Sequence, residues 1–256
     1  MSDTKQVPAT ATSTIKLPSR GVLYGGLIPD GAVEVRKLTV QEISILESQG
    51  SGGIERLNTV LRSCCRLPNP GIHHGQLLIT DRMAILLALR TFTYGPLYNF
   101  QYKCMFCGSV CKSTVNIAED LEEHEADDEL KEPITVELKD SNSVVMLRFL
   151  RGDDEDKVAK YAKRVKMQSN DQGDPSSMHR IALQIVALNG DEKVELRRRE
   201  DFVRGLTAAD LIRLNKAVDE KEPGLDLTVF PDCSSCGSTN ELNMPFTGEF
   251  FRPTNV

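Results

Sequence analysis

Two Cys-x-x-Cys pairs that lie far apart in the chain constrain its fold more than any other feature of the sequence. The pairs are Cys104 with Cys107 and Cys233 with Cys236. The 125 residues from 108 to 232 separate them. Alternating apolar and polar residues, which are typical of β-strands, flank each pair. We therefore predict two hairpins, formed by residues 97–117 and 225–246, with the cysteines in their turns.

The four cysteines favour a shared metal ion. Seven cysteines in 256 residues are too few for a disulfide scaffold, and the N-terminus has no secretory signal pattern, so we expect reduced thiols. Structural zinc almost always has four ligands, so either pair alone is an incomplete site. We predict that both pairs bind one zinc ion and that the two hairpins are the halves of a split zinc ribbon.

Other interpretations of the cysteines stay open at this point. They could be ordinary thiols, one pair could have lost metal binding, or all four could hold an iron–sulfur cluster. A redox pair is disfavoured, because neither pair has the strand-to-helix context of such motifs. Cys111, four residues after Cys107, could replace a ligand, but its place in the outgoing strand favours an ordinary buried or surface thiol.

The sequence shows no catalytic apparatus. A site of four thiolates leaves a zinc ion no position for water, so it supports architecture and not catalysis. The chain contains no HExxH pattern, no Walker loop, no GxSxG elbow and no paired acid and base. We predict that the protein is not an enzyme and has no small-molecule substrate.

Composition and periodicity predict an α+β protein. The predicted divisions are a flexible tail (1–14), a helical N-terminal region (15–96), the split ribbon (97–117 plus 225–246), an acidic linker (118–133), an inserted α+β region (134–224) and an aromatic C-terminal tail (247–256).

The helical N-terminal region is expected to hold three helices. The first follows a capping box of Thr39 and Glu42. Three of its apolar residues are expected to point inward: Val40, Ile43 and Leu46. The second begins near Ile54, and the third is expected to have Thr80 as its cap. Between residues 82 and 90 the third helix is apolar on nearly every side, so we place it at the centre of the core.

The inserted region is expected to begin with a hairpin of residues 134–138 and 143–150. Helices should follow after Asp153, over residues 177–188, and from Thr207, where a second capping signature occurs.

Most of the negative charge lies in one segment. The net charge is −6, and nine carboxylates lie between Glu119 and Glu132 with Lys131 as the one positive residue. The densest positive set is Lys157, Lys160, Lys163, Arg164, Lys166 and Arg197–Arg199. This set lacks the interleaved aromatic residues of a nucleic-acid surface, so we expect protein partners and no nucleic acid. A zinc-ribbon nucleic-acid-binding accessory factor is the alternative interpretation.

The chain is expected to be soluble and made in the cytoplasm. Its longest apolar run, residues 83–89, is far shorter than the roughly 20 residues that cross a bilayer. Near the C-terminus, Phe246, Phe250 and Phe251 lie within six residues. They either cover the zinc ribbon or form a docking tail for a partner.

In their order along the chain, several segments resemble the T4-like baseplate protein family of contractile-tailed phages. These segments are LPSRGVLY from Leu17, VEVRKLTVQEISIL from Val33, LLITDRMAILLALRTFTYG, YKCMFCG, and CSSCG through MPFTGEFFRP. The resemblance covers residues 17–253 and is least specific in the middle, where the acidic stretch departs from it.

The resemblance implies a structural subunit of the baseplate hub or a factor that helps the hub assemble. The implied partners are other baseplate hub or tail proteins. The implied location is the host cytoplasm during assembly, and then the tail baseplate of the virion.

Overall fold

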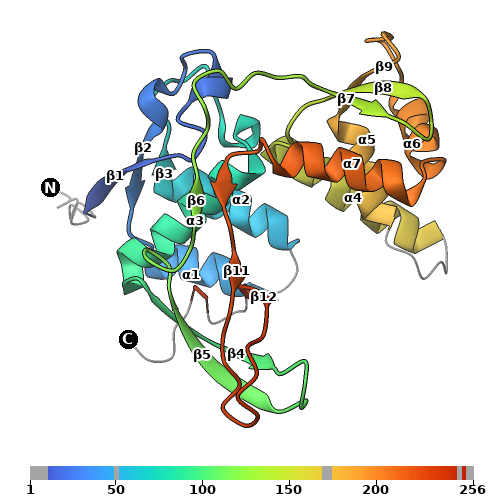
Figure 1. Cartoon of the computed structure of the whole chain (residues 1–256). Coiled ribbons are helices and arrows are strands. Elements are labelled where there is room, and N and C mark those ends of the chain that lie inside the picture. The colour runs from blue at the N-terminus through green and yellow to red at the C-terminus, as the bar shows by residue number, and fades with distance from the viewer. Residues whose placement is uncertain (1–10, 49–51, 169–174, 247–249, 252–256) are drawn as a thin grey trace, which may run out of the picture.

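The computed structural model describes residues 11–48, 52–168, 175–246 and 250–251 of the 256-residue chain, and the side chains at 166–168 and 175 are not described. The described residues form both helices and strands, as predicted (Figure 1). The N-terminal region occupies the left and middle of Figure 1, the inserted region the upper right, and the two cysteine hairpins the bottom.

The N-terminal region combines a small sheet with three helices. Its elements are β1 (Thr12–Lys16), β2 (Ala32–Arg36), α1 (Val40–Glu47), α2 (Gly53–Cys64), β3 (Cys65–Arg66) and α3 (Ile79–Tyr94), with 3-10 turns at Val22–Tyr24, Pro29–Gly31 and His74–Gln76. The sheet is antiparallel in the order β1-β2-β3, and Thr12 pairs with Arg36. Strand β1 therefore starts inside the predicted tail, because alternating residues from Thr12 onward pair with β2. Residues 1–10 lie outside the described residues.

Helix α3 is the buried centre of this region, as predicted. Ile85 and Leu89 are fully buried, and the charged residues Asp81, Arg82 and Arg90 are buried with them. Asp81 accepts hydrogen bonds from the Ser19 amide (3.0 Å) and from the Tyr24 hydroxyl. These bonds satisfy the buried carboxylate and fix the 17–24 loop on the start of α3.

Two details of the predicted helices are wrong. The capping box of Thr39 and Glu42 is present, and Leu46 packs against the core as predicted. Val40 is 82% exposed, because α1 turns Ile45 toward the core and Val40 away from it. Helix α3 begins at Ile79, and Thr80 is not its cap. The Thr80 side chain lies inside the first turn against Gly224, where an added Cβ would come within 3.0 Å of it.

The acidic segment packs against the N-terminal region. Strand β6 (Glu123–His124) pairs with β10 (Gly224–Leu225), so the chain entering the inserted region lies beside the chain leaving it. The Ala126 amide donates to the Pro18 carbonyl (2.8 Å), and Arg20 forms an ion pair with Asp128 (2.9 Å). The predicted linker is thus held along its middle by hydrogen bonds and charge.

The inserted region has its own antiparallel sheet in the order β7-β8-β9, with four helices. Its elements are β7 (Ile134–Leu138), β8 (Ser143–Leu147), α4 (Gly152–Gln168), α5 (Pro175–Gln184), β9 (Ile185–Leu188), α6 (Leu196–Arg204) and α7 (Ala208–Asp219). The predicted hairpin is confirmed, and Thr207 caps α7 by accepting from the Asp210 amide (3.1 Å).

The helix predicted over 177–188 is wrong in its last turn. It ends at Gln184, and residues 185–188 form β9 because Ile185 and Leu188 pair with β8 and are buried in the core. Helix α6 was not predicted. Its sequence is rich in arginine, and its few apolar residues, Leu196, Phe202 and Val203, pack against the core.

Candidate metal centre

The first cysteine pair lies in the turn of a long hairpin. Strands β4 (Leu97–Lys103) and β5 (Val110–Asn116) are antiparallel and pair along seven positions. Alternate residues of β4, namely Tyr98, Phe100 and Tyr102, are buried on one face. One face of the hairpin is therefore aromatic and buried. Figure 1 shows β4 and β5 running side by side away from the helices.

Backbone hydrogen bonds shape the turn that holds Cys104. The Gly108 amide donates to the Cys104 carbonyl (3.0 Å), and the Cys104 amide donates to the Ser109 carbonyl (2.9 Å). The Phe106 amide points at the Cys104 sulfur, with an N···Sγ distance of 3.4 Å. Gly108 has φ +75°, a left-handed conformation that glycine adopts without steric cost.

The second turn repeats these contacts position by position. The Gly237 amide donates to the Cys233 carbonyl (2.8 Å), and the Cys233 amide donates to the Ser238 carbonyl (2.9 Å). The Ser235 amide lies 3.4 Å from the Cys233 sulfur, and Gly237 has φ +73°. The two turns share the sequence Cys-x-x-Cys-Gly-Ser and adopt one local geometry.

The second hairpin is much shorter than the first. Strands β11 (Thr228–Val229) and β12 (Leu242–Asn243) pair at two positions. Side chains and backbone of the first hairpin fix its position. The Met105 amide donates to the fully buried Asn240 side chain (2.9 Å), and the Tyr98 hydroxyl donates to the Pro245 carbonyl (2.7 Å).

The two turns bring the four predicted cysteines together. All four sulfur atoms lie within 4.8 Å of one another, and they belong to Cys104, Cys107, Cys233 and Cys236. The Sγ–Sγ distances are 3.8 Å between Cys104 and Cys236 and 3.6 Å between Cys107 and Cys233. Four sulfurs placed tetrahedrally about a zinc ion at about 2.3 Å would lie about 3.8 Å apart. The donor set and its spacing therefore fit one tetrahedral ion.

The pKa values of Cys104 and Cys233, the buried cysteine of each pair, differ. The amides of Cys107 and Phe106 lower the pKa of Cys104 to about 6, against the opposing effect of burial. The amides of Cys236 and Ser235 favour the Cys233 thiolate too, but burial and the neighbouring thiols Cys111 and Cys236 raise the pKa of Cys233 to about 12. Four negative sulfurs at this spacing repel one another, and a bound cation would remove that repulsion.

A fifth cysteine contacts the cluster. Cys111, at the start of β5, is buried, and its sulfur lies 3.4 Å from the Cys233 sulfur. The Ser234 hydroxyl is 3.7 Å from the Cys111 sulfur. The sequence showed that Cys111 is near Cys107, but the contact with the distant Cys233 depends on how the hairpins meet.

The aromatic C-terminal residues pack against the hairpins. Phe250 is fully buried, with its ring centroid 5.1 Å from that of Tyr98 and 4.7 Å from that of Phe251. Phe246 stacks edge-on against Phe250 and is 42% exposed. The sequence left two interpretations, a cover for the hairpins or a docking tail for a partner, and the packing of Phe250 matches the first. Residues 247–249 and 252–256 lie outside the described residues.

This cluster has the composition of an architectural site. Four cysteine ligands would fill the tetrahedral coordination of a zinc ion. Across residues 11–48, 52–168, 175–246 and 250–251, it is the one group of three or more metal-binding side chains close enough to share an ion. No helix in the same residues is long and apolar enough to cross a bilayer.

Comparison with known proteins identifies the family. A family model described as "T4 bacteriophage base plate protein" matches residues 12–252, nearly the whole chain, so this protein belongs to that family. Neither the curated proteins nor the solved structures gave a match. Family membership supports a structural role in a phage baseplate, points to a component of the virion tail, and implies contacts with other tail or baseplate proteins.

Proposed function

We propose that this protein is a structural or assembly component of the baseplate hub in a contractile phage tail. It acts through contacts with other hub or tail proteins, in the host cytoplasm during assembly and then in the baseplate. A zinc ion held by Cys104, Cys107, Cys233 and Cys236 fixes the two hairpins to each other. The observation that carries the proposal is that four sulfurs from two distant segments lie within 4.8 Å of one another in a protein of the baseplate family.

The hub part of the proposal rests on the order of the motifs along the chain, and two of these motifs are also neighbours in the fold. The LPSRGVLY segment and the LLITDR segment contact each other directly, because the Ser19 amide and the Tyr24 hydroxyl donate to Asp81. The motifs that resemble hub proteins are therefore parts of one folded unit.

Metal analysis tests the zinc part. Purified chain is expected to hold one zinc ion per molecule by inductively coupled plasma mass spectrometry. The double variant Cys233→Ser/Cys236→Ser should hold essentially none, because two thiolates leave the site incomplete. Cys64→Ala, a matched removal of a buried thiol in α2, should keep its zinc. Zinc-free wild-type protein, or a double variant with full zinc content, would contradict the site.

Complementation tests the hub part. Phage that lack this gene are expected to give tails without complete baseplates in electron micrographs, and wild-type protein supplied in trans should restore them. Mass spectrometry of purified particles then separates a retained subunit from a transient assembly factor. Normal baseplates in the absence of the gene would contradict the proposed role.

A further inference from the structure

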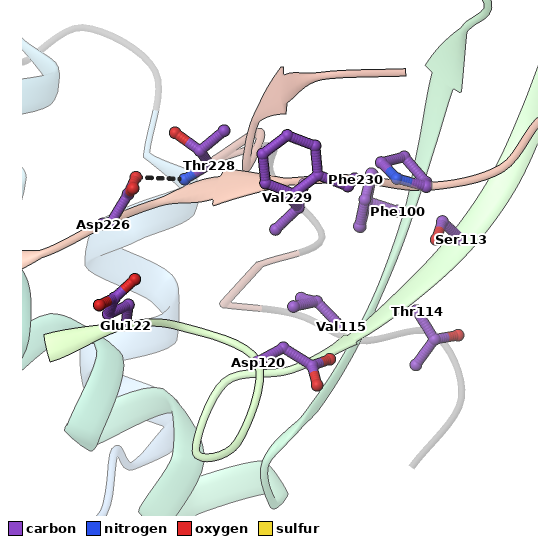
Figure 2. Close-up of a pocket in the computed structure, with 11 residues that line it drawn as sticks. Phe100, Ser113, Thr114, Val115, Asp120, Glu122, Asp226, Thr228, Val229 and Phe230 are labelled. Atoms are coloured by element: carbon purple, nitrogen blue, oxygen red, sulfur yellow. Dashed lines mark hydrogen bonds between the residues drawn. The ribbon is translucent and has the colours of Figure 1, made fainter. Parts of the chain in front are cut away.

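A pocket of about 390 Å³ opens between the two cysteine hairpins, and no cysteine lines it (Figure 2). One wall comes from β5 and the turn that follows it, and the other comes from residues 226–231. Its apolar part is formed by Phe100, Val115 and Val229, which are buried. The pocket can therefore take an apolar stem as well as a polar group.

Acidic side chains surround this pocket. Figure 2 shows Asp120 and Glu122 on one side and Asp226 on the other. Its lining contains no lysine, arginine or histidine. The Thr228 amide donates to Asp226 (2.8 Å), and its hydrogen bonds lower the pKa of that carboxyl. The pocket is thus negative at neutral pH, and its charge calls for a cationic occupant.

The spacing of the three carboxylates argues against a bare metal ion. Within the described residues, Asp120, Glu122 and Asp226 do not form a group close enough to share one ion. A larger cation that spreads its charge over several donors is the better match. A guanidinium group has five N–H donors in a plane and can bind two carboxylates at once.

An exposed aromatic ring at the pocket also favours a guanidinium group. Phe230 lines the pocket and is 64% exposed. Guanidinium groups stack on such rings more readily than ammonium groups, and the methylene stem of an arginine packs on apolar surface. Together, Phe230, the apolar floor and the acidic rim match the parts of one arginine side chain.

We propose that this pocket binds an arginine side chain of a neighbouring baseplate protein. The inference rests on the proposed function, because it assumes that the chain works through contacts with other baseplate proteins. The walls belong to segments on either side of the inserted region, so the pocket exists only while the two hairpins are held together.

Nuclear magnetic resonance on the zinc-loaded full chain tests the pocket. The probe is the tripeptide acetyl-Gly-Arg-Gly-amide, with acetyl-Gly-citrulline-Gly-amide as its neutral isostere. The arginine peptide should shift the amide resonances of Val115, Thr228 and Val229 saturably. The citrulline peptide should shift them at least tenfold less at the same concentration, because charge-assisted hydrogen bonds are lost.

Two triple variants with equal charge change give the matched control. Asp120→Asn/Glu122→Gln/Asp226→Asn keeps one acceptor oxygen on each side chain but removes the pocket charge, and should weaken arginine-peptide binding about tenfold or more. Glu119→Gln/Glu129→Gln/Glu241→Gln removes three exposed charges outside the lining and should bind nearly as wild type does. Phe230→Leu should weaken binding by a smaller factor.

The outcomes separate this inference from the proposed function. Absent or non-saturable shifts, equal shifts with citrulline, or equal losses in both triple variants would overturn the arginine pocket. In that case the complementation experiment still stands, and the protein can be a hub component that docks elsewhere. If the purified chain binds the arginine peptide specifically but phage without the gene still build normal baseplates, the proposed function is overturned and the arginine pocket is not.

Discussion

The inserted region and the cysteine hairpins both extend from the N-terminal helices, but they are stabilised differently. Apolar residues of β7, β8 and β9 belong to the same buried cluster as those of α2 and α3. The hairpins form a separate, smaller and aromatic-rich cluster that contains Cys104, Cys111 and Cys233. The inserted region also comes from one continuous stretch of chain, whereas the hairpins meet from opposite sides of it.

The two regions differ in whether they need a cross-link to be stable. A three-stranded sheet packed on helices buries enough apolar surface to be stable without a cross-link. A ladder of two residue pairs, such as β11 with β12, is marginal by itself. A metal ion that joins distant segments also restricts the unfolded chain, which is worth several kcal/mol for a loop of more than about 100 residues. We therefore expect the hairpins to depend on the metal and the inserted region to be independent of it.

The largest expected effect comes from removal of two ligands. In Cys233→Ser/Cys236→Ser, amide hydrogens of residues 228–243 should exchange about ten-thousandfold faster by mass spectrometry, because their hairpin loses its cross-link. Amides of β7, β8 and β9 should be nearly unchanged. Equal loss of protection in the inserted region would break the distinction between the two regions.

Cys111→Ala is the control for this prediction. Its sulfur touches Cys233 but is absent from the tetrahedral set, so the variant should keep its zinc and most of its amide protection. Zinc loss in Cys111→Ala would make that thiol a ligand.

The next largest effect should come from Phe250. Phe250→Ala leaves a cavity among aromatic rings in the hairpin core, and large-to-small changes of this kind cost about 3–5 kcal/mol in the free energy of unfolding. Phe246→Ala, which removes a ring that is 42% exposed, should cost about 1 kcal/mol. Urea titration measures both. Equal costs would mean that the aromatic residues do not form a buried cap on the hairpins.

A charge change should produce the third effect, within the inserted region. Asp154 is buried, and burial alone would raise its pKa. Hydrogen bonds from Arg148, Arg151 and Lys157 overcome this and lower the pKa of Asp154 to about 2. Asp154→Asn should cost about 3 kcal/mol at pH 7, because it removes the negative charge and one of the two oxygens that accept from the Arg148 guanidinium, at 2.7 and 2.9 Å.

The pH dependence of this effect has a defined sign. A lowered pKa contributes stability above the unfolded value of 3.8, and that stability is lost as the pH falls toward 2. The gap between wild type and Asp154→Asn should therefore narrow between pH 4 and pH 2 in urea titrations. Asp153→Asn, one residue earlier and half-exposed, should change stability by less than about 1 kcal/mol. A gap that stays constant down to pH 2 would contradict the assignment.

Much of this architecture could be predicted from local sequence, because its causes are local. Thr39 with Glu42 and Thr207 with Asp210 form capping contacts over three residues, and each Cys-x-x-Cys-Gly turn is fixed by its own amides. Other features depend on packing between distant segments. The exposure of Val40, the switch from α5 to β9 at Ile185, and the contact of Cys111 with Cys233 are of this kind.

The candidate site divides along the same line. The residue types and their spacing indicated four metal ligands, whereas the acidic pocket beside them combines residues 100–122 with residues 226–231. Such a pocket has no signature in sequence, because its two walls become neighbours only when the hairpins meet.

The smallest predicted effect lies where the inserted region rejoins the rest of the protein. Glu222 follows α7 and precedes β10. Burial, together with the charges of Asp219, Glu132 and Asp81, raises its pKa to about 7. The unfolded chain loses this proton near pH 4.5, so the stability associated with it is present below that pH and is lost as the pH rises through 7.

Glu222→Gln should therefore stabilise the protein by about 1–2 kcal/mol at pH 8 and by almost nothing at pH 4. Glu220, two residues before Glu222, is exposed and forms an ion pair with Lys216. Glu220→Gln should therefore be neutral or slightly destabilising at both pH values. Urea titrations at pH 4 and pH 8 measure both variants. Stabilisation that persists at pH 4 would point to packing rather than charge. Hydrogen exchange of the same variant shows where the effect is located. If only the amides of β6 and β10 exchange more slowly, the junction opens locally and leaves the inserted sheet and the cysteine hairpins intact.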